Sequence, residues 1–521
     1  MSTPHAKLAA ALRVLQRLQK RNGGVIEGTS LSDAHRQLLV DAGFLRPVLK
    51  GWYISANPRD NAGDSTVWYA SYWAFVAGYL RARFSKRYCL SAVGSLLQHT
   101  GSTVVPTQTV AVTTTGGTST LTLPEATSLL IYPDANAVPK TRTLLNGLQV
   151  WPLAAALCRV DAGFFRNHPQ DAQIALQLVR DPGVLLAELL ADDGLPAAAG
   201  RLAGALRFLD RDADADRIIK AMELASHQVR EANPFDIPVP TLHARTERSP
   251  YALRLRAMWA NWRTTVAAAF PETPVVQTDT AQYLESVQER YAADAYNSLS
   301  IEGYQVSDAL IARVAAGRWN PEADDADAQS RDALAARGYY LAFQEVKTSI
   351  TAVLQTANAG AVAREGHHDW FAALFAPSAQ AGIVNATQLA GYRSGPVYIR
   401  GSMHTPPPND AIADCMDALF DLLATEPSPA VRAVLGHHLF AFVHPYPDGN
   451  GRIARFLMNT MLASGGYPWT VIRVSRRAEY LAALEAASVG GDIVPFTRFV
   501  AGEMAVGAPT ASAAADAKGA P

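Results

Sequence analysis

The chain has 521 residues, of which 49% are hydrophobic and 18% are charged, and its formal net charge at pH 7 is −1. This length predicts two to four domains, and the composition is typical of a soluble globular protein. A net charge so close to zero excludes a general attraction to nucleic acid or membrane surfaces, so any basic patch must be local. The three cysteines lie far apart and form neither a zinc pattern nor a disulfide framework, which favours a reducing compartment.

The first twenty residues have Lys and Arg scattered among their apolar positions and lack the apolar core of a signal peptide. No uninterrupted apolar run in the chain approaches the length of a membrane span. We therefore expect a cytoplasmic protein without a membrane partner. The alanine-rich composition is typical of a bacterial source.

Residues 1–60 have the pattern of a small helical domain that ends in a hairpin. Lys7–Arg21 and Asp33–Ala42 are expected to be helices, and Phe44–Ser55 alternates around Lys50-Gly51 like a β-hairpin. The order helix, helix, hairpin predicts a winged helix-turn-helix.

This segment holds nine Lys or Arg against four Asp or Glu. It resembles the winged-helix domain of abortive-infection antitoxins and related regulators, in which a pair like Lys50-Gly51 followed by an aromatic residue closes the wing. Two interpretations stay open, namely DNA binding and a winged helix used only for packing or protein contact. If DNA is bound, we expect phosphate contacts from Arg36, Arg46 and Lys50.

Residues 61–230 form a mixed α/β region with a weaker resemblance to the same regulators. Its first helix is aromatic, and we expect Trp68, Tyr72 and Phe75 to be core residues. Strands are expected between Thr103 and Tyr132, and helices follow to Leu224. We find no catalytic constellation in this region.

A proline-rich linker and a helix are predicted at 231–270, and the residues 271–505 read as a mainly helical domain. Residues 506–521 consist of small residues with little to bury, which predicts a disordered tail. The fold class we expect is mainly α.

Two segments of the helical domain are notable for their spacing. Residues 279–303 form a predicted helix in which Ser298 and Glu302, four apart, share one face and Gly303 is a helix stop. Further on, Tyr392–His404 contains alternating apolar residues and flanking glycines, which predicts a short hairpin.

The most informative stretch runs from His444 to Arg455. An apolar helical run leads into it and an amphipathic run leaves it, which predicts helix–loop–helix. The loop contains two prolines for stiffness, and Gly449 and Gly451 allow close backbone approach. The exposed amides at the start of the second helix are a natural phosphate site.

The charged residues of the stretch complete a set of groups for attack on a nucleotide phosphate. Arg452 and Arg455 lie near one face of the first helical turn and can reach further phosphates. Asp448 is a hard oxygen ligand placed to hold Mg²⁺, and His444 can take a proton at neutral pH.

This stretch resembles the signature of the Fic family, H-[PX]-F-x-[DE]-G-N-G-R-x-x-R, over its whole length. Tyr446 stands where the family has Phe, which keeps the ring and adds a hydroxyl. The resemblance covers roughly residues 275–505. It implies an all-α Fic core with a β-hairpin flap, preceded here by the winged-helix-like domain and the mixed α/β region.

The resemblance also implies an activity, which is Mg²⁺-dependent transfer of AMP from ATP to a Tyr, Thr or Ser hydroxyl of a protein target, or of the chain itself. His444 would be the base and Asp448 the metal ligand. The phosphates would be held by Gly449, Asn450, Gly451, Arg452 and Arg455.

Three further segments acquire roles from the same resemblance. Ser298, Glu302 and Gly303 match the inhibitory motif [ST]-x-x-x-E-[GN], in which the Glu pairs with the second arginine of the signature, here Arg455. The nucleotide would be covered by the flap residues Val397, Tyr398 and Ile399. Tyr480 matches an aromatic that lines the adenine pocket, and Ser488 stands where many relatives have Asn.

Other functions stay open on the sequence alone. The same site could remove AMP or transfer another phosphate-containing group. The chain could also be a DNA-binding regulator or antitoxin-like protein whose Fic part senses nucleotide. A homodimer is a further open prediction.

Overall fold

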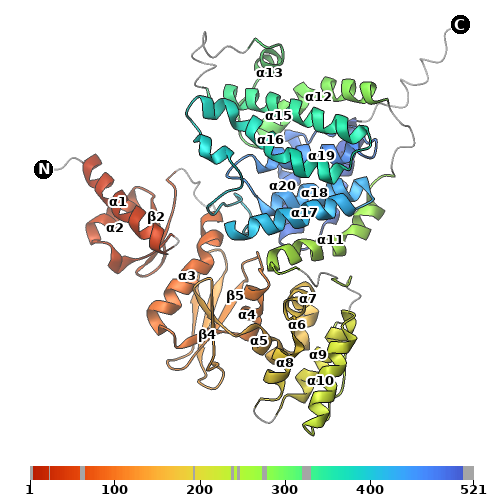
Figure 1. Cartoon of the computed structure of the whole chain (residues 1–521). Helices are drawn as coiled ribbons and strands as arrows, with labels where there is room; N and C mark the ends of the chain where they lie inside the picture. The colour runs from red at the N-terminus through yellow and green to blue at the C-terminus, as the bar shows by residue number, and fades with distance from the viewer. Residues whose placement is uncertain are drawn as a thin grey trace. The chain divides into compact units, whose positions relative to one another are not determined.

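The computed structural model in Figure 1 describes residues 4–22, 24–58, 65–191, 194–235, 240–242, 247–272, 279–318 and 330–507. It divides into two units. The first contains Met1–Ala257 together with Tyr398–Thr405, and the second contains Met258–Val397 and Pro406–Pro521. The predicted tail beyond 507 lies outside the described residues.

The first part of the first unit is a small sheet covered by two helices. Its elements are α1 (Pro4–Asn22), β1 (Val25–Glu27), the 3₁₀ helix η1 (Gly28–Ser30), α2 (Asp33–Asp41), β2 (Leu45–Leu49) and β3 (Trp52–Ser55). The sheet is antiparallel in the order β1-β3-β2. The predicted hairpin around Lys50-Gly51 is confirmed, with Gly51 in the turn at φ +81°.

The second part of this unit is built around an aromatic helix and a mixed sheet. Its elements are α3 (Thr66–Phe84), β4 (Tyr88–Leu90), α4 (Ala92–His99), β5 (Gln108–Thr113), β6 (Ser119–Thr122), β7 (Ser128–Pro133), β8 (Thr143–Leu145) and β9 (Leu148–Val150). The larger sheet has the order β4-β5-β7-β6, and only β5 and β7 are parallel. Trp68, Tyr72 and Phe75 are buried, which confirms their prediction as core residues.

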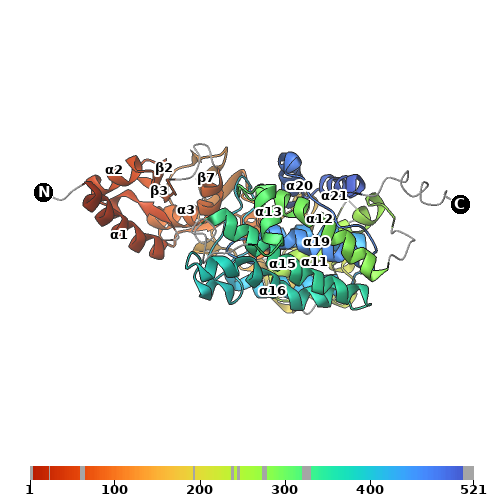
Figure 2. The same ribbon diagram turned by 90° about the horizontal axis from the view of Figure 1, so that it is seen from above.

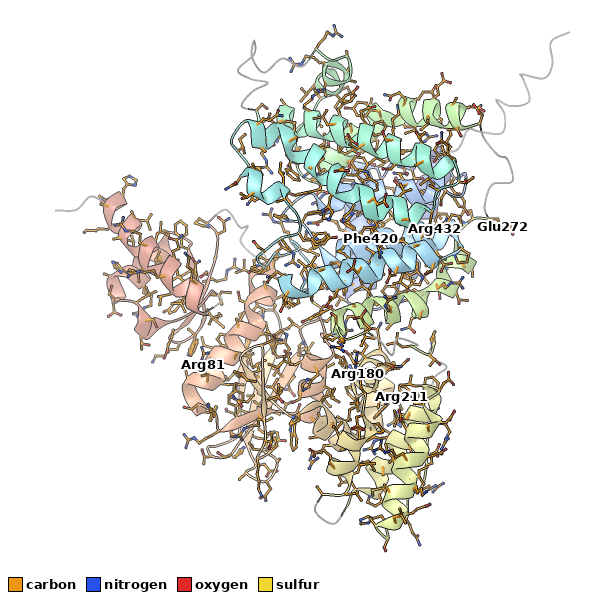
Figure 3. All side chains as sticks on the ribbon, in the orientation of Figure 1. Arg81, Arg180, Arg211, Glu272, Phe420 and Arg432 are labelled. Atoms are coloured by element: carbon orange, nitrogen blue, oxygen red, sulfur yellow. The ribbon has the colours of Figure 1, made fainter. Side chains whose placement is uncertain are left out.

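Short helices complete the first unit: α5 (Leu153–Arg159), α6 (Ala162–Asn167), α7 (Pro169–Leu178), α8 (Pro182–Leu189), α9 (Pro196–Phe208) and α10 (Asp212–Leu224). Their apolar faces form one core, which is rich in Ala and Leu. Arg211, labelled in Figure 3, donates to the carbonyl of Leu176 and thereby ties the start of α10 to α7.

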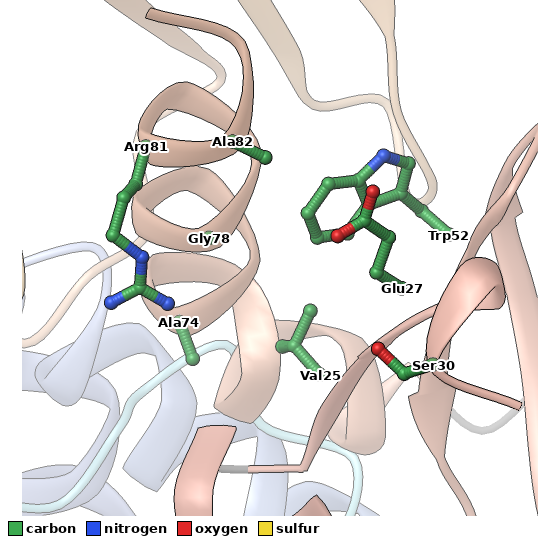
Figure 4. A pocket seen from close by; sticks show the side chains of 8 residues that line it. All are labelled: Val25, Glu27, Ser30, Trp52, Ala74, Gly78, Arg81 and Ala82. Carbon is green, nitrogen blue, oxygen red and sulfur yellow. The ribbon is translucent and has the colours of Figure 1, made fainter. Parts of the chain in front are cut away.

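A cavity of 230 Å³ lies in the first unit between α3 and the strands β1 and β3 (Figure 4). It is lined by Val25, Glu27, Ser30, Trp52, Ala74, Gly78, Arg81 and Ala82. These eight residues include no histidine and no cysteine, and we assign no chemistry to this cavity.

In its described residues the second unit consists of helices and loops and contains no named strand. It contains α11 (Pro250–Ala269), whose first two turns count with the first unit, and α12 (Thr280–Ile301), α13 (Asp308–Ala315), α15 (Arg331–Leu354), α16 (Ala359–Gln380), η2 (Ala386–Leu389), η3 (Asn409–Ala411), α17 (Ile412–Thr425), α18 (Pro429–Val443), α19 (Asn450–Ala463), η4 (Val474–Arg476), α20 (Arg477–Ser488) and α21 (Val494–Gly507). The fold is mainly α, as predicted.

Within this unit the long helices α15 and α16 run side by side, as both ribbon views show (Figures 1 and 2). Helix α19 packs against α15, α16 and α18, and all its residues from Arg452 to Ala463 are buried. The loop that precedes α19 is therefore held at the end of a core helix. Among the described residues, the structure contains no helix with the length and apolar character needed to span a membrane.

The hairpin predicted for Tyr392–His404 is wrong. These residues form no strand, and His404 instead makes an isolated bridge with Val104 of the first unit. The Gly401 amide donates to Thr66 Oγ1 at 2.8 Å, and the Ser402 amide donates to the carbonyl of Ile399 at 3.1 Å in a local turn, so the backbone groups of this segment form no hairpin ladder. Tyr398–Thr405 accordingly folds as part of the first unit.

Candidate active site

The loop between α18 and α19 places His444 at the point where α18 ends. His444 has a left-handed backbone, with φ 52° and ψ 58°, which is uncommon for a residue other than glycine. Its amide still donates to the carbonyl of Phe440, so the turn is continuous with the helix. The side chain is only partly buried.

The imidazole of His444 has a defined tautomer. Its Nδ1 lies 3.2 Å from the carbonyl oxygen of Ala441, which can only accept, so Nδ1 carries the proton and Nε2 is left with a lone pair. Burial lowers the pKa of His444 more than any other effect, and the charge of Arg393 lowers it further. The hydrogen bond to Ala441 and the charges of Glu302 and Asp448 oppose this shift without cancelling it.

The start of α19 offers unpaired backbone donors. Gly449 is its N-cap residue, with φ +80°, and a glycine cannot cap the helix with a side chain. The amides of Asn450, Gly451 and Arg452 have no acceptor in the described part of the chain. Three N–H groups and the positive end of the helix dipole therefore point to one place.

Arg452 adds a buried positive charge beside these amides. It is 1% exposed, and its guanidinium lies 5.1 Å from the ring centres of both Tyr304 and Phe375. Its Nη2 is 3.5 Å from Asp448 Oδ1, whereas its buried Nε has no acceptor among the described residues. A buried donor without a partner indicates a site that an anion can fill.

Arg455 is held by the end of α12. Its Nε donates to Ser298 Oγ at 2.8 Å, and its Nη2 donates to the Ser298 carbonyl at 3.1 Å and to Glu302 Oε1 at 2.8 Å. Its Nη1 is buried without an acceptor in the described residues. Glu302 thus occupies Nη2 of Arg455, and Nη1 is the donor that remains for a phosphate.

The Glu302 carboxylate keeps 29% of its side-chain surface exposed. Burial raises its pKa, but the charges of Arg455 and Arg452 and the hydrogen bond from Arg455 together outweigh burial and lower it. The carboxylate is therefore ionised at neutral pH and occupies the positive region at the start of α19.

The C-terminal end of α12 is built to present Glu302. Gly303 has φ +86°, its amide donates to Ser300, and the next amide, of Tyr304, donates to Leu299, which is a Schellman-type helix end. Arg477 on α20 donates from Nε to the carbonyl of Ile301 at 2.8 Å, which places a cation at the negative end of the helix.

The structure places Asn450 differently from the expected phosphate ligand. Its Oδ1 accepts from the amide of Tyr446 at 2.9 Å, and its Nδ2 donates to the carbonyl of the same residue at 2.8 Å. Both ends of the side-chain amide are thus used by the loop. Asn450 holds the loop closed, and only its backbone amide remains for an anion.

Tyr446 is fully buried behind the loop. Its ring stacks on Phe371 with a centroid distance of 3.9 Å and an interplanar angle of 6°, and its hydroxyl lies 2.9 Å from His368 Nδ1. The hydroxyl added by the Phe-to-Tyr difference from the Fic signature therefore has a partner. His367 and His368 lie within α16 and pack around this ring.

Tyr480, the residue expected to line an adenine pocket, has its ring buried in the second unit. Tyr480 is 2% exposed, and its hydroxyl lies 2.9 Å from His437 Nε2, so almost no ring surface is left for an adenine. Val397 belongs to the second unit, whereas Tyr398 and Ile399 count with the first. The role of these three flap residues over the nucleotide stays a prediction from resemblance.

The metal site that these residues offer is incomplete on its own. Asp448 is 59% exposed, and its Oδ1 accepts from the Gly449 amide at 2.6 Å. The described residues contain no group of three or more His, Cys, Asp or Glu that could hold a metal. One exposed carboxylate beside an anion site fits Mg²⁺, which commonly takes its other ligands from phosphates and water.

Sequence reasoning missed three side chains of this site. Arg393 donates from Nε to the carbonyl of His444 at 2.8 Å, and Tyr304 covers Arg452. Asp294 is buried one helical turn before Ser298, and its Oδ2 accepts from Tyr339 at 2.6 Å. The i, i+4, i+8 spacing of Asp294, Ser298 and Glu302 was the available signal for the last one.

Chemically, the arrangement combines a neutral base, two buried guanidinium groups, free helix amides and an exposed carboxylate. Such a set can bind a polyphosphate, neutralise charge that develops during its attack, and accept a proton from a nucleophile.

Comparison with known proteins agrees with this picture. Residues 367–462 match the model of the Fic/DOC family, so this part of the chain is a Fic domain. Over 124 residues the chain is 40% identical to protein adenylyltransferase Fic of Nematostella vectensis, which covers 23% of this chain and 28% of that protein. Over 122 residues it is 37% identical to protein adenylyltransferase fic-1 of Caenorhabditis elegans, covering 23% of each.

The chain thus spans about a quarter of the length of these curated relatives. Among solved structures, a segment of Fic-1 from C. elegans is similar with a TM-score of 0.39 and 19% identity, covering 70% of this chain and 92% of that one.

Proposed function

We propose that this chain, which carries a Fic domain, transfers AMP from ATP to a Tyr, Thr or Ser hydroxyl of a protein target or of the chain itself. The observation that carries the proposal is the tautomer of His444: Nδ1 is fixed by Ala441, so Nε2 is the basic atom beside the anion site of α19. The two relatives named protein adenylyltransferase support the same reaction.

In the proposed step the target hydroxyl oxygen attacks the α-phosphorus of ATP. A new bond forms between that oxygen and the α-phosphorus, while the bond from the α-phosphorus to the oxygen bridging to the β-phosphate breaks. The hydroxyl proton goes to Nε2 of His444, AMP stays on the target, and pyrophosphate leaves. Positioning and neutralisation of charge supply most of the acceleration in such transfers.

The phosphates would be bound by the free amides of Asn450, Gly451 and Arg452 and by the guanidinium groups of Arg452 and Arg455. The unpaired Nε of Arg452 and Nη1 of Arg455 supply the donors that no residue of the described chain uses. Mg²⁺ held by Asp448 would add positive charge at the phosphates, which one carboxylate beside an anion site can accommodate.

We further propose that Glu302 keeps the resting enzyme inactive. Its carboxylate binds Arg455 and fills the space over Gly451. In the proposed reaction these two positions would bind the terminal phosphates of ATP. ATP that binds beside Glu302 would hold its α-phosphate out of line for attack. Removal of the carboxylate should free the site.

The test is labelling by α-³²P-ATP of four proteins: wild type, Glu302→Gly, His444→Ala and the double variant. We expect little label with wild type, more with Glu302→Gly, and none in either protein that lacks His444. Equal labelling with and without His444 would refute the mechanism. Label from γ-³²P-ATP instead of α-³²P-ATP would show transfer of a different group by the same site.

A second candidate function is DNA binding by residues 1–60, which the element order of α1, α2 and the β2–β3 hairpin favours. The charges of α2 count against it, because Arg36 pairs with Asp33 and the helix ends on a further aspartate. A salt-dependent gel shift with the full chain tests this function, and no shift at low salt removes it. The antitoxin-like role, homodimer, bacterial source and cytoplasmic location stay predictions from sequence.

A further inference from the structure

Arg393 makes an unusual set of contacts around the histidine of the candidate active site. Its Nε donates to the carbonyl of His444 at 2.8 Å, and its Nη2 donates to Val443 at 3.4 Å and to Pro407 at 2.6 Å. Its Nη1 donates to Gly395 at 2.9 Å. The side chain is buried, and every one of these acceptors is a backbone carbonyl.

The backbone amide of Arg393 adds a further contact, to the carbonyl of Pro445 at 2.9 Å. One residue thus binds three consecutive carbonyls, those of Val443, His444 and Pro445. These carbonyls set the peptide planes on both sides of His444. A left-handed backbone costs a non-glycine residue on the order of 1–3 kcal/mol and persists only where its surroundings over-determine it. Arg393 provides that determination.

The charge of Arg393 also has a place in the site. Its guanidinium lies at the C-terminal end of α18, where the negative end of the helix dipole favours a buried cation. Burial lowers the pKa of Arg393 to about 10, which leaves it charged at neutral pH. The charged groups that face His444 are Arg393, Glu302 and Asp448. Burial lowers the pKa of the imidazole most, and of these three charges Arg393 lowers it further while the two carboxylates raise it.

We propose that Arg393 is a positioning residue for His444, which fixes its backbone so that Nδ1 stays on Ala441 and Nε2 is left to take the proton. The catalytic part of this inference rests on the proposed AMP transfer. The geometric part does not, because the backbone and the imidazole of His444 can be observed without any reaction.

A matched pair of variants separates geometry from charge. Arg393→Lys keeps the charge but cannot span the carbonyls with a planar fork, whereas Arg393→Gln removes both. Arg432→Gln is the control, because Arg432 is an arginine near the other end of α18 that also donates to backbone carbonyls, those of Glu426 and Pro427 (Figure 3). All three are made in the Glu302→Gly chain.

The kinetic readout is the split between kcat and KM for ATP. We expect kcat to fall about 100-fold in both Arg393 variants, because small misplacement of a catalytic group costs about that much. KM for ATP should change less than about threefold, since the phosphates are bound by α19 and not by Arg393. Arg432→Gln should leave kcat close to that of the parent.

The second readout is the nitrogen NMR titration of His444 in ¹⁵N-histidine-labelled protein, assigned with His444→Ala. Arg393→Gln should raise the pKa of His444, Arg393→Lys should leave it low, and both should lose the single Nδ1–H tautomer. If both readouts in Arg393→Gln match those of Arg432→Gln, the proposal is wrong. If the parent chain transfers no AMP, the titration still decides the role of Arg393.

Discussion

The carboxylate of Glu302 lies against the Cα of Gly451, at the first turn of α19. A Cβ placed at position 451 would come within 2.4 Å of Glu302 Oε1, so this contact requires a glycine. The backbone itself does not, because Gly451 is helical and has no positive φ. The glycine therefore leaves room for an anion over the helix start, and in this structure that anion is Glu302.

This contact predicts a coupled effect of two substitutions. In the wild-type chain Gly451→Ala should bring no gain in stability, because the new methyl group collides with the flexible end of Glu302 and pushes it away from Arg455. In a Glu302→Gly chain the collision is gone, and Gly451→Ala should stabilise α19 by about 0.5–1 kcal/mol through helix propensity. Thermal unfolding of the four proteins measures both values.

A double-mutant cycle tests whether Gly451 is needed because of its contact with Glu302 or only because of a bound anion. A coupling larger than about 0.5 kcal/mol supports direct contact with Glu302. Additive effects would contradict it and would assign the glycine to the anion site alone.

The lowered pKa of His444 predicts the acidic limit of AMP transfer. The base works only when neutral, so the rate should be constant at neutral pH and fall as the pH drops through the pKa, which lies below the ordinary 6.5. Loss of Glu302, whose charge raises this pKa, should move the limit further toward acid. Labelling rates of Glu302→Gly across acidic pH measure it, and a midpoint above 6.5 would contradict the burial argument.

The spacing of the signature predicted the helix–loop–helix and the placement of His444, Asp448 and the two arginines in one site. It could do so because these residues lie in a short loop and in the helical turns that follow it, whose geometry is regular. Asn450 was expected to bind phosphate, and its loop-closing role was not predicted, because a side-chain amide that closes its own loop looks, in sequence, the same as one that binds a ligand. Arg393 escaped because its partners are backbone carbonyls, which no residue type marks.

The predicted hairpin at Tyr392–His404 was wrong for a different reason. Alternating apolar residues between Tyr392 and His404 show that a segment can pair, but not with what. Among the described residues its β-bridge is to Val104, far away in sequence, and such long-range partners have no local signal.

Tyr446→Phe should cost little. It retains the stacking on Phe371 and removes the hydroxyl contacts to His368 Nδ1 and to the carbonyl of His367, so the free energy of unfolding should fall by about 0.5–1.5 kcal/mol. AMP transfer in the Glu302→Gly chain should not change. Tyr446→Leu, which also removes the stacking, should lose more stability, and equal losses in the two variants would show that the hydroxyl matters more than the ring.

Removal of the metal should abolish labelling, and a substitution at Asp448 should make it harder to restore. Asp448→Asn keeps an oxygen that can accept from the Gly449 amide but loses the charge. We expect the Mg²⁺ concentration for half-maximal labelling to rise at least about tenfold. Asp410→Asn, an exposed carboxylate on η3, is the control for charge. An unchanged requirement for Mg²⁺ in Asp448→Asn would exclude it as the ligand.

Asp294, one turn before Ser298, should make stability depend on pH. Burial raises its pKa to about 6, and the hydrogen bond from Tyr339 and the charge of Arg455 oppose burial only in part. Between pH 3.8, the ordinary value for aspartate, and about 6, the unfolded chain releases this proton while the folded chain keeps it. The contribution of Asp294 to the free energy of unfolding is therefore fully present below that window and is lost as the pH rises through it.

Asp294→Asn should remove this contribution, because an asparagine oxygen can still accept from Tyr339 without ionising. The Tm of the variant relative to wild type should therefore rise as the pH increases across the window, and then stay constant. Glu289→Gln, which removes an exposed carboxylate from the same helix, should not reproduce this change. A Tm difference for Asp294→Asn that is independent of pH would mean that Arg455 compensates the buried charge fully, and that α12 stays equally well docked in acid and at neutral pH.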